Sequence, residues 1–168
     1  IRLQSVCPVA DDFHALRDAI QKQYAYYLQA GVTRLPHLDR YAHWIPVLPD
    51  LERMQVAASR CTGRRDFATF QGAKAATKTT IRDLIEFEVK QVPHPFLGSA
   101  QSILCFRLLG TGFLKQMVRS LVGTVLEVGL DRRDVVSLDG LFAAPDRLEV
   151  GETLPAKGLF LERVWYKT

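Results

Sequence analysis

The segment from Phe113 to Val128 constrains the fold of this chain more than any other feature of the sequence. Apolar residues fill most of it, Gly110 and Gly112 precede it, and Gly129 follows it as a helix stop. A helix that is apolar on most sides is enclosed by protein rather than laid on a surface. The rest of the chain must therefore supply the elements that cover it.

Short stretches of alternating apolar residues predict strands on both sides of this helix. They lie at residues 1–9, 20–28, 81–89, 102–109 and 158–166. The third and fourth are expected to form a β-hairpin with a broad loop at 93–98. In the last strand, Leu159, Leu161, Arg163 and Trp165 alternate and are expected on one face. Strands interspersed with helices and an antiparallel hairpin indicate an α+β fold in one domain spanning residues 1–168.

Two further helices are predicted from their capping residues. Asp50 is placed as an N-cap ahead of apolar residues at helical spacing, and Gly63 ends that helix. Asp131 is expected to cap a shorter helix whose apolar residues are Val135, Leu138, Leu141 and Phe142. The stretch from Gly31 to Pro49 contains three prolines and no sustained periodicity, which predicts an irregular connection.

The positive charge of the chain is concentrated in one segment. The net charge of the 168 residues is +4. Between Arg60 and Arg82 the single acid is Asp66, against Arg60, Arg64, Arg65, Lys74, Lys78 and Arg82. Both a solvated basic surface and a surface for an anionic partner fit this pattern.

Cysteine and histidine usage point away from disulfide and metal chemistry. Cys7, Cys61 and Cys105 are odd in number and widely spaced, which favours a reduced, cytoplasmic protein. The four histidines lack metal-ligand spacing, and no apolar run approaches the roughly 20 residues that span a bilayer. We therefore expect no metal site and no membrane contact.

Polar residues within the apolar segments are the candidates for chemistry. Lys115 and Arg119 are four residues apart and are expected on one helix face, with Thr111 one turn earlier. That face is either a solvated stripe or a cationic surface directed at a phosphate or carboxylate. Tyr24, with its neighbours Tyr26 and Tyr27, follows Lys22 in a strand, where tyrosines serve packing or stack on an unpaired base.

Five motifs in order resemble the C-terminal portion of tRNA pseudouridine synthases of the TruA type. They are Phe13-His14-Ala15 with Lys22-x-Tyr24-x-Tyr26; Asp50 to Met54 with Gly63-x-x-Asp66-Phe67-x-x-Phe70; Arg82; Phe113-Leu114-x-x-Met117-Val118-Arg119-x-x-Val122-Gly123; and Pro155-Ala156-x-Gly158-Leu159-x-Leu161-x-x-Val164-x-Tyr166. Together they extend over nearly the whole chain, and their order makes the resemblance specific.

The resemblance implies a fold, an activity and roles for individual residues. The family isomerises uridine to pseudouridine in tRNA, classically in the anticodon stem-loop, without metal or cofactor and as a homodimer. It implies an antiparallel or mixed sheet with helices on one face. Tyr24 and Arg119 would be the catalytic pocket residues, Arg119 pairing with a nucleophilic aspartate, and Leu159 an apolar wall beside the uracil. Substrate-binding roles are implied for Phe13, His14, Lys22, Arg64, Arg65, Lys74, Lys78, Arg82 and Lys115.

Two departures from the family pattern affect what this chain can do alone. Leu16 stands where the family has an arginine, and Arg17 follows it. The family's nucleophile lies in an Arg-Thr-Asp-x-Gly stretch in its N-terminal domain, and these 168 residues contain no such stretch. Asp66 matches a later element, for which a structural role is implied. The chain is therefore expected to be inactive without an N-terminal domain.

Three hypotheses remain open on the sequence. The chain is part of a synthase, or a nucleophile-free RNA-binding module of the same fold, or a domain whose matching motifs describe only its core. The first two predict tRNA binding, and the third does not.

Overall fold

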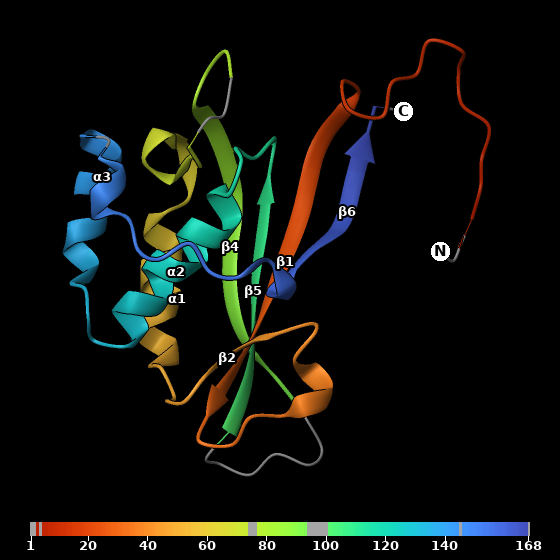
Figure 1. The fold of residues 1–168 in the computed structure, drawn as a ribbon. Coiled ribbons are helices and arrows are strands. Elements are labelled where there is room, and N and C mark those ends of the chain that lie inside the picture. Colours follow the sequence, from red (N-terminus) through yellow and green to blue (C-terminus); the bar gives the residue numbers. More distant parts are fainter. Residues whose placement is uncertain (1–2, 4, 74–76, 94–100, 145, 168) are drawn as a thin grey trace.

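In the part of the chain that the structure describes, a six-stranded sheet forms the centre of the fold (Figure 1). The computed structural model describes residues 3, 5–73, 77–93, 101–144 and 146–167. The strands run in the order β2-β1-β5-β4-β3, and β6 pairs with β1. Within the described residues β2 is parallel to β1 and the other pairs are antiparallel, so the sheet is mixed, as predicted. The bounds are β1 (Ala19–Gly31), β2 (His43–Ile45), β3 (Gly63–Asp66), β4 (Ile81–Val92), β5 (Gln101–Gly110) and β6 (Leu159–Tyr166).

The long strand β1 organises the sheet because it has three partners. One edge of β1 pairs with β5 from Lys22 to Gly31. The other edge pairs first with β6, where Tyr26 lies opposite Leu159, and then with β2. This arrangement brings the beginning of β6 beside the middle of β1, although the two strands are far apart in the sequence.

The helices lie together on one face of the sheet (Figure 1). They are α1 (Leu51–Arg60), α2 (Met117–Gly129) and α3 (Gly140–Ala143). Asp50 caps α1 as predicted, because its carboxylate accepts the Arg53 N–H at 3.0 Å. Short 3₁₀ helices occur at Pro36–Leu38, Ala68–Phe70, Val135–Leu138, Arg147–Glu149 and Ala156–Gly158. The expectation of an α+β fold with helices on one face is confirmed.

Helix α2 is almost entirely buried, as its composition predicts, but it begins later than the apolar pattern does. Gln116 has a left-handed φ of 65°, which ends any helical run through it, and α2 starts at Met117. Thr111 and Lys115 therefore lie outside the helix. The prediction that Lys115 and Arg119 share one helix face is wrong.

Residues 150–158, which we call the strap, cross α2 and lead into β6. A Cβ on Gly123 of α2 would lie 1.9 Å from the carbonyl oxygen of Glu152, so this crossing requires glycine. The hydroxyls of Ser120 and Thr153 are 2.9 Å apart. The strap is thus held against the backbone of α2 before it delivers the chain to Leu159.

The strand predicted at residues 1–9 does not form in its described part. Leu3 and Val6 are 77% and 83% exposed, and Val9 is exposed as well. The alternating side chains find no apolar surface to cover among the described residues, and Pro8 has no N–H for a ladder. Residues 1, 2 and 4 of the prediction lie outside the described part of the chain.

The helix predicted after Asp131 is divided and has a different cap. Asp131 has φ 58° in the turn after α2, and it is Asp134 whose carboxylate accepts the Val136 N–H at 3.0 Å. A 3₁₀ helix follows, and then α3. Leu138 and Leu141 are buried, so the apolar residues of this prediction are placed correctly although the cap is wrong.

A β-bulge in β6 changes which side chains share a face. Tyr24 is paired with Leu161 but its neighbour Gln23 is paired with Arg163, so Glu162 is an extra residue. Because of the bulge, Arg163 and Trp165 face away from the side that carries Leu159 and Leu161. The prediction that all four residues share one face is therefore wrong for Arg163 and Trp165.

Candidate active site and nucleic-acid interface

A surface pocket of about 450 Å³ lies where β1, β6 and the beginning of α2 meet. It brings together residues from three separate parts of the sequence. Its lining consists of Tyr24, Phe113, Leu114, Lys115, Gln116, Met117, Val118, Arg119 and Leu159. The three residues singled out as pocket residues in the sequence, Tyr24, Arg119 and Leu159, therefore lie around one cavity.

Tyr24 supplies an aromatic wall. It is half-buried in β1, and its ring meets the ring of Phe113 edge to face, with centroids 5.1 Å apart. Burial raises the pKa of Tyr24 above its ordinary value. The phenol is therefore neutral near pH 7, where its ring can pack against an unsaturated ring and its hydroxyl can donate a hydrogen bond.

Phe113 was not singled out from the sequence as a site residue. The Phe113 ring fits beside Gly110 because this residue has no side chain. A Cβ at position 110 would lie 3.2 Å from the ring. In the sequence Phe113 opens the apolar segment and looks like a core residue. Its position after two glycines, at the entrance to the segment, was the available signal.

Arg119 supplies the positive charge of the pocket. Its Nε donates a hydrogen bond of 2.5 Å to the carbonyl oxygen of Leu154 in the strap. Within the described residues the two terminal nitrogens of the guanidinium have no hydrogen-bond partner. The side chain is thus anchored by one edge, which leaves its terminal fork for a carboxylate or phosphate.

The strap, which accepts the hydrogen bond from Arg119, also accepts one from Tyr26. The hydroxyl of Tyr26 donates to the carbonyl oxygen of Pro155 at 2.8 Å. Burial raises the pKa of Tyr26 above its ordinary value, so the hydroxyl keeps the proton that it donates. A Cβ on Gly158 would lie 2.8 Å from the Tyr26 ring. Leu159 begins β6 directly afterwards and packs against the core. The position of this apolar wall therefore depends on the strap.

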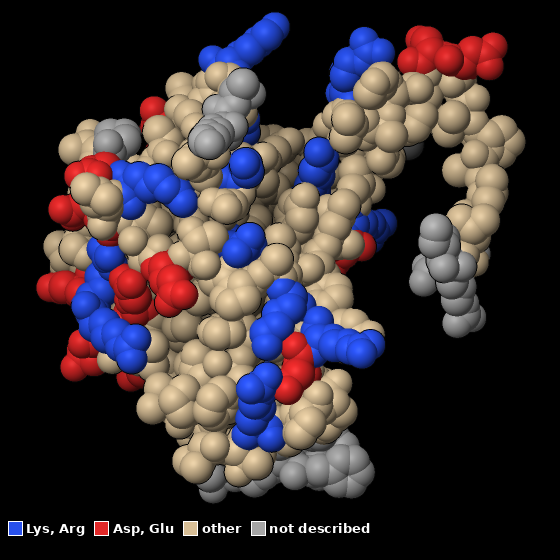
Figure 2. Space-filling view, viewed as in Figure 1, with Lys and Arg blue, Asp and Glu red and all other residues tan. Residues whose placement is uncertain are grey.

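Basic side chains continue from the pocket across one face of the molecule, which we call the basic face and which includes Lys115 and Arg82. Figure 2 shows Lys and Arg on both sides of the hollow between the helical side and the ends of β1 and β6. Lys115 is exposed at the pocket and its Nζ donates to the Ala73 carbonyl at 3.4 Å. Arg82 donates to the Thr79 carbonyl at 2.9 Å, and its side chain passes beside Gly112.

The other cations of the basic segment are not equivalent. Arg64 and Lys78 are exposed, and Lys74 lies outside the described residues. Arg60 forms an ion pair of 2.7 Å with Asp139, and Arg65 lies 4.0 Å from the same carboxylate with its guanidinium over the Phe142 ring. The structure therefore ties Arg60 and Arg65 to the α3 region.

Asp66 has a local structural contact. Its carboxylate accepts the N–H of Ala68 at 2.9 Å, where the chain turns from β3 into the helix Ala68–Phe70. The side chain of Asp66 is not among those that line the pocket. Both observations agree with the structural role that its motif implies.

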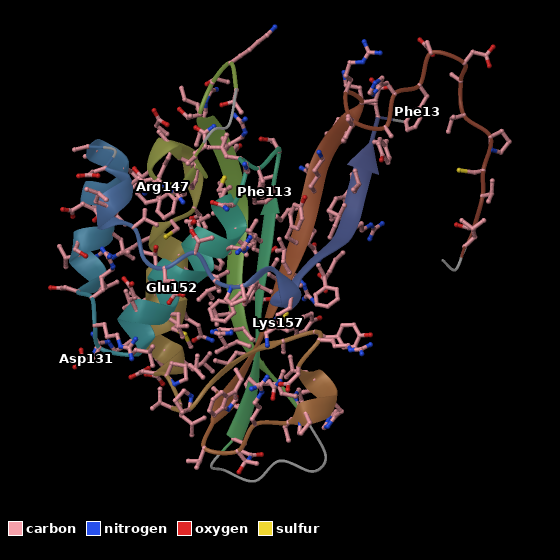
Figure 3. All side chains as sticks on the ribbon, viewed as in Figure 1. Phe13, Phe113, Asp131, Arg147, Glu152 and Lys157 are labelled. Carbon is pink, nitrogen blue, oxygen red and sulfur yellow. The ribbon has the colours of Figure 1, made fainter. Side chains whose placement is uncertain are left out.

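The first motif lies at the other end of β1 and β6. The ring of Phe13 packs on Tyr166 with centroids 5.0 Å apart, and the imidazole Nδ1 of His14 accepts the Leu16 N–H at 3.2 Å. Figure 3 shows Phe13 beside the end of β6, away from Phe113. Lys22 is two residues before Tyr24 in β1 and shares its face. Phe13 and His14 are therefore outside the pocket, and Lys22 lies between them and it.

The residues that the structure describes contain neither a cluster of metal ligands nor a helix suited to a membrane. Nowhere in the residues that the structure describes do three or more His, Cys, Asp or Glu side chains group together as a metal site requires. No helix in the described ranges has the length and apolar character needed to cross a bilayer.

A pocket with an aromatic wall, an apolar wall and a guanidinium, set in a basic face, is the arrangement expected of a protein that accepts an unstacked base. A family model described as tRNA pseudouridine synthase matches residues 57–167. The chain belongs to this family.

Individual relatives extend the match over the rest of the chain. The chain is 37% identical to tRNA pseudouridine synthase A of Latilactobacillus sakei, over 94% of this chain and 61% of that protein. It is 37% identical to the protein of the same name from Myxococcus xanthus, over 95% of this chain and 57% of that protein. It is 32% identical to the tRNA pseudouridine synthase A of Syntrophotalea carbinolica, over 99% of this chain and 63% of that protein. The chain thus spans less than two thirds of the length of these curated relatives.

Proposed function

We propose that this chain provides the tRNA-binding face and one wall of the active site in a tRNA pseudouridine synthase. The observation that carries the proposal is that Tyr24, Arg119 and Leu159 surround one pocket at the edge of a basic face. The family assignment and the relatives named tRNA pseudouridine synthase A support it.

In this proposal each pocket residue has a separate task. A uridine leaves its stack, and its base enters between the Tyr24 ring and Leu159. The terminal nitrogens of Arg119 hold the nucleophilic aspartate ionised and oriented through a charge-assisted hydrogen bond. The aspartate comes from the additional length that the relatives possess.

The reaction is an isomerisation, so it needs no oxidant, reductant or second substrate. The bond between the ribose carbon and the uracil nitrogen breaks, the base turns, and the same ribose carbon is joined to a ring carbon. That ring carbon loses its proton, and the freed nitrogen gains one. The Tyr24 ring lies against the base while it turns, and its hydroxyl is placed to take part in the proton transfer.

The substrate, the assembly and the compartment that we propose are those of the family that the chain resembles. The target is a uridine of the anticodon stem-loop of tRNA, the assembly is a homodimer, and the compartment is the cytoplasm. The buried positions of Cys61 and Cys105 as free thiols are compatible with a reducing compartment.

The test of the proposal uses the synthase extended to the length of its relatives. We expect Arg119→Ala to lower turnover at saturating tRNA by about 100-fold or more, because an oriented charge contact at the reacting centre is lost. The dissociation constant for tRNA should change by less than a few fold. Arg132→Ala is the matched control, since it removes an exposed arginine at the other end of α2.

Three outcomes would contradict the proposal. Equal losses of turnover and affinity for Arg119→Ala would make this side chain a phosphate contact rather than a partner of the aspartate. A tRNA-binding protein without turnover, whose upstream reading frame lacks an Arg-Thr-Asp-x-Gly stretch, would instead be the nucleophile-free RNA-binding module. If the chain does not bind tRNA even at low salt, neither function applies.

A further inference from the structure

Arg147 is an exposed cation that the sequence motifs leave without a role. It begins the short helix Arg147–Glu149, and Figure 3 shows it on the helical side of the molecule. Its guanidinium donates to two acceptors, the carbonyl oxygen of Gln71 and, at 3.3 Å, the side-chain oxygen of Gln116. These acceptors belong to two different parts of the proposed site.

Gln71 begins the loop that leads to β4 and carries the exposed Lys78, and we call this loop the basic loop. Next to it, the N–H of Gly72 donates to the Lys115 carbonyl at 2.7 Å, and the Lys115 ammonium donates back to the Ala73 carbonyl. A Cβ on Gly72 would lie 2.5 Å from the Gln116 side-chain oxygen. The first residues of the basic loop, Gln71 to Ala73, therefore contact the turn that precedes α2.

That turn is part of the pocket. Lys115 and Gln116 both line it, and Arg119 follows in the first turn of α2. Gln116 adopts its left-handed conformation with its side chain held between Gly72 and Arg147. A shift of the basic loop would consequently move the turn on which the pocket depends.

We propose that Arg147 is a positioning residue that holds the basic loop in register with the base pocket. This inference rests on the proposed function. When Lys78 of the basic loop contacts the tRNA backbone, the guanidinium of Arg147 holds the loop relative to the Gln116 turn. The extruded uridine then meets the aspartate that Arg119 orients. A planar guanidinium suits this task because it reaches two acceptors with a fixed separation.

Direct binding of a tRNA phosphate is the competing role for an exposed arginine. The two roles differ in their dependence on salt. A phosphate contact contributes about 0.7–0.9 to the slope of log affinity against log salt concentration, whereas a positioning residue leaves that slope unchanged. They differ also in where activity is lost, because a positioning residue affects the reaction of bound tRNA.

The experiment compares Arg147→Ala, Arg147→Lys and the control Arg132→Ala in the synthase extended to the length of its relatives. We expect Arg147→Ala to lower single-turnover rates at saturating tRNA by about tenfold or more with an unchanged salt slope. Lysine should fail to restore the rate because its ammonium is a point donor. Hydrogen exchange at the Gly72 amide should become faster, which reports the loss of the loop contact without reference to activity.

A second variant tests the same contact from the other side. Gln116→Gly removes the acceptor of Arg147, while glycine tolerates the left-handed backbone, so the fold should survive. The variant should reproduce the loss in rate. A salt slope reduced by about 0.7–0.9 with a normal rate for Arg147→Ala would identify a phosphate contact and overturn the inference.

The remaining outcomes separate the inference from the function on which it rests. If the wild-type synthase turns over and Arg147→Ala matches it in rate and in Gly72 exchange, the inference alone is overturned. If the wild-type synthase has no turnover, the proposed function fails, and the inference fails with it.

Discussion

The glycine at position 123 should be indispensable for the contact between α2 and the strap. Glycine in a helix interior is about 0.8–1.0 kcal/mol less favourable than alanine, so Gly123→Ala would stabilise an isolated α2. In the folded chain the added Cβ would lie 1.9 Å from the Glu152 carbonyl oxygen and 3.1 Å from its carbonyl carbon. Both neighbours are backbone atoms, so no side-chain rotation can relieve the overlap.

The size of the effect follows from what must move. Relief requires the strap to shift by more than 1 Å, judged against ordinary contact distances, and overpacking of this kind costs about 1–3 kcal/mol. The same shift separates the hydroxyls of Ser120 and Thr153, a hydrogen bond that contributes about 1 kcal/mol. After subtraction of the gain in helix propensity, we expect a net loss of about 2 kcal/mol.

Urea unfolding followed by circular dichroism measures this loss. With a slope of about 2 kcal/mol/M, the midpoint should fall by about 1 M while the slope stays constant. Gly140→Ala is the matched control, because the added Cβ at the start of α3 has nothing within 4 Å. That variant should be neutral or slightly more stable. A Gly123→Ala protein as stable as the wild type would refute the reasoning about the strap.

Three further predictions concern the cap, one ion pair and the thiols. Asp50→Ala should lower the unfolding free energy by about 1 kcal/mol and Tm by about 2–4 °C in thermal unfolding, because α1 loses its N-cap. The Arg107 guanidinium lowers the pKa of Glu162 in the folded chain. This pair therefore stabilises the fold fully above the unfolded pKa of about 4.3, and the stabilisation is lost as the pH falls through the lowered folded pKa. The difference in unfolding free energy between the wild type and Glu162→Gln, measured across pH, should accordingly vanish in acid. With a thiol reagent at pH 8, exposed Cys7 should react at once, whereas burial raises the pKa of Cys61 to about 12 and its modification should await unfolding.

Much of the framework of this fold could be predicted from local patterns. Strands β1 and β4 have alternating apolar residues, β5 has a weaker alternation, and α1 has both an apolar face and an aspartate cap. These signals are local, since each depends on neighbours within one or two turns of the chain. The short strands β2 and β3 have only three and four residues, which is too few for periodicity to identify.

The start of α2 could not be predicted from its own residues. The apolar pattern continues through Phe113 and Leu114, and Gln116 is compatible with a helix. The left-handed turn at Gln116 accompanies contacts with Gly72 and Arg147, which are remote in sequence. Tertiary contacts of this kind leave no periodic signal at the helix terminus.

The candidate site was predicted in part, and for a particular reason. Tyr24, Arg119 and Leu159 were placed by ordered motifs, and no rule of spacing could have joined residues so far apart. The motifs could not show which of the basic side chains form ion pairs within the chain. Arg65 resembles a phosphate-binding residue in the sequence, but its pairing with Asp139 depends on how α3 packs beside β3.

The bulge in β6 makes the length of that strand as important as its side chains. Leu159 lies on the pocket side, whereas Arg163 and Trp165 stack together on the opposite side, with the guanidinium 4.8 Å from the ring centroid. One additional residue at Glu162 separates these two halves. Loss of that single residue would turn one half of the strand over, so that either Leu159 leaves the pocket or Trp165 enters that side. Relatives of this chain can therefore exchange residues in β6 more readily than they can gain or lose one, and an alignment gap within this strand would mark a changed pocket.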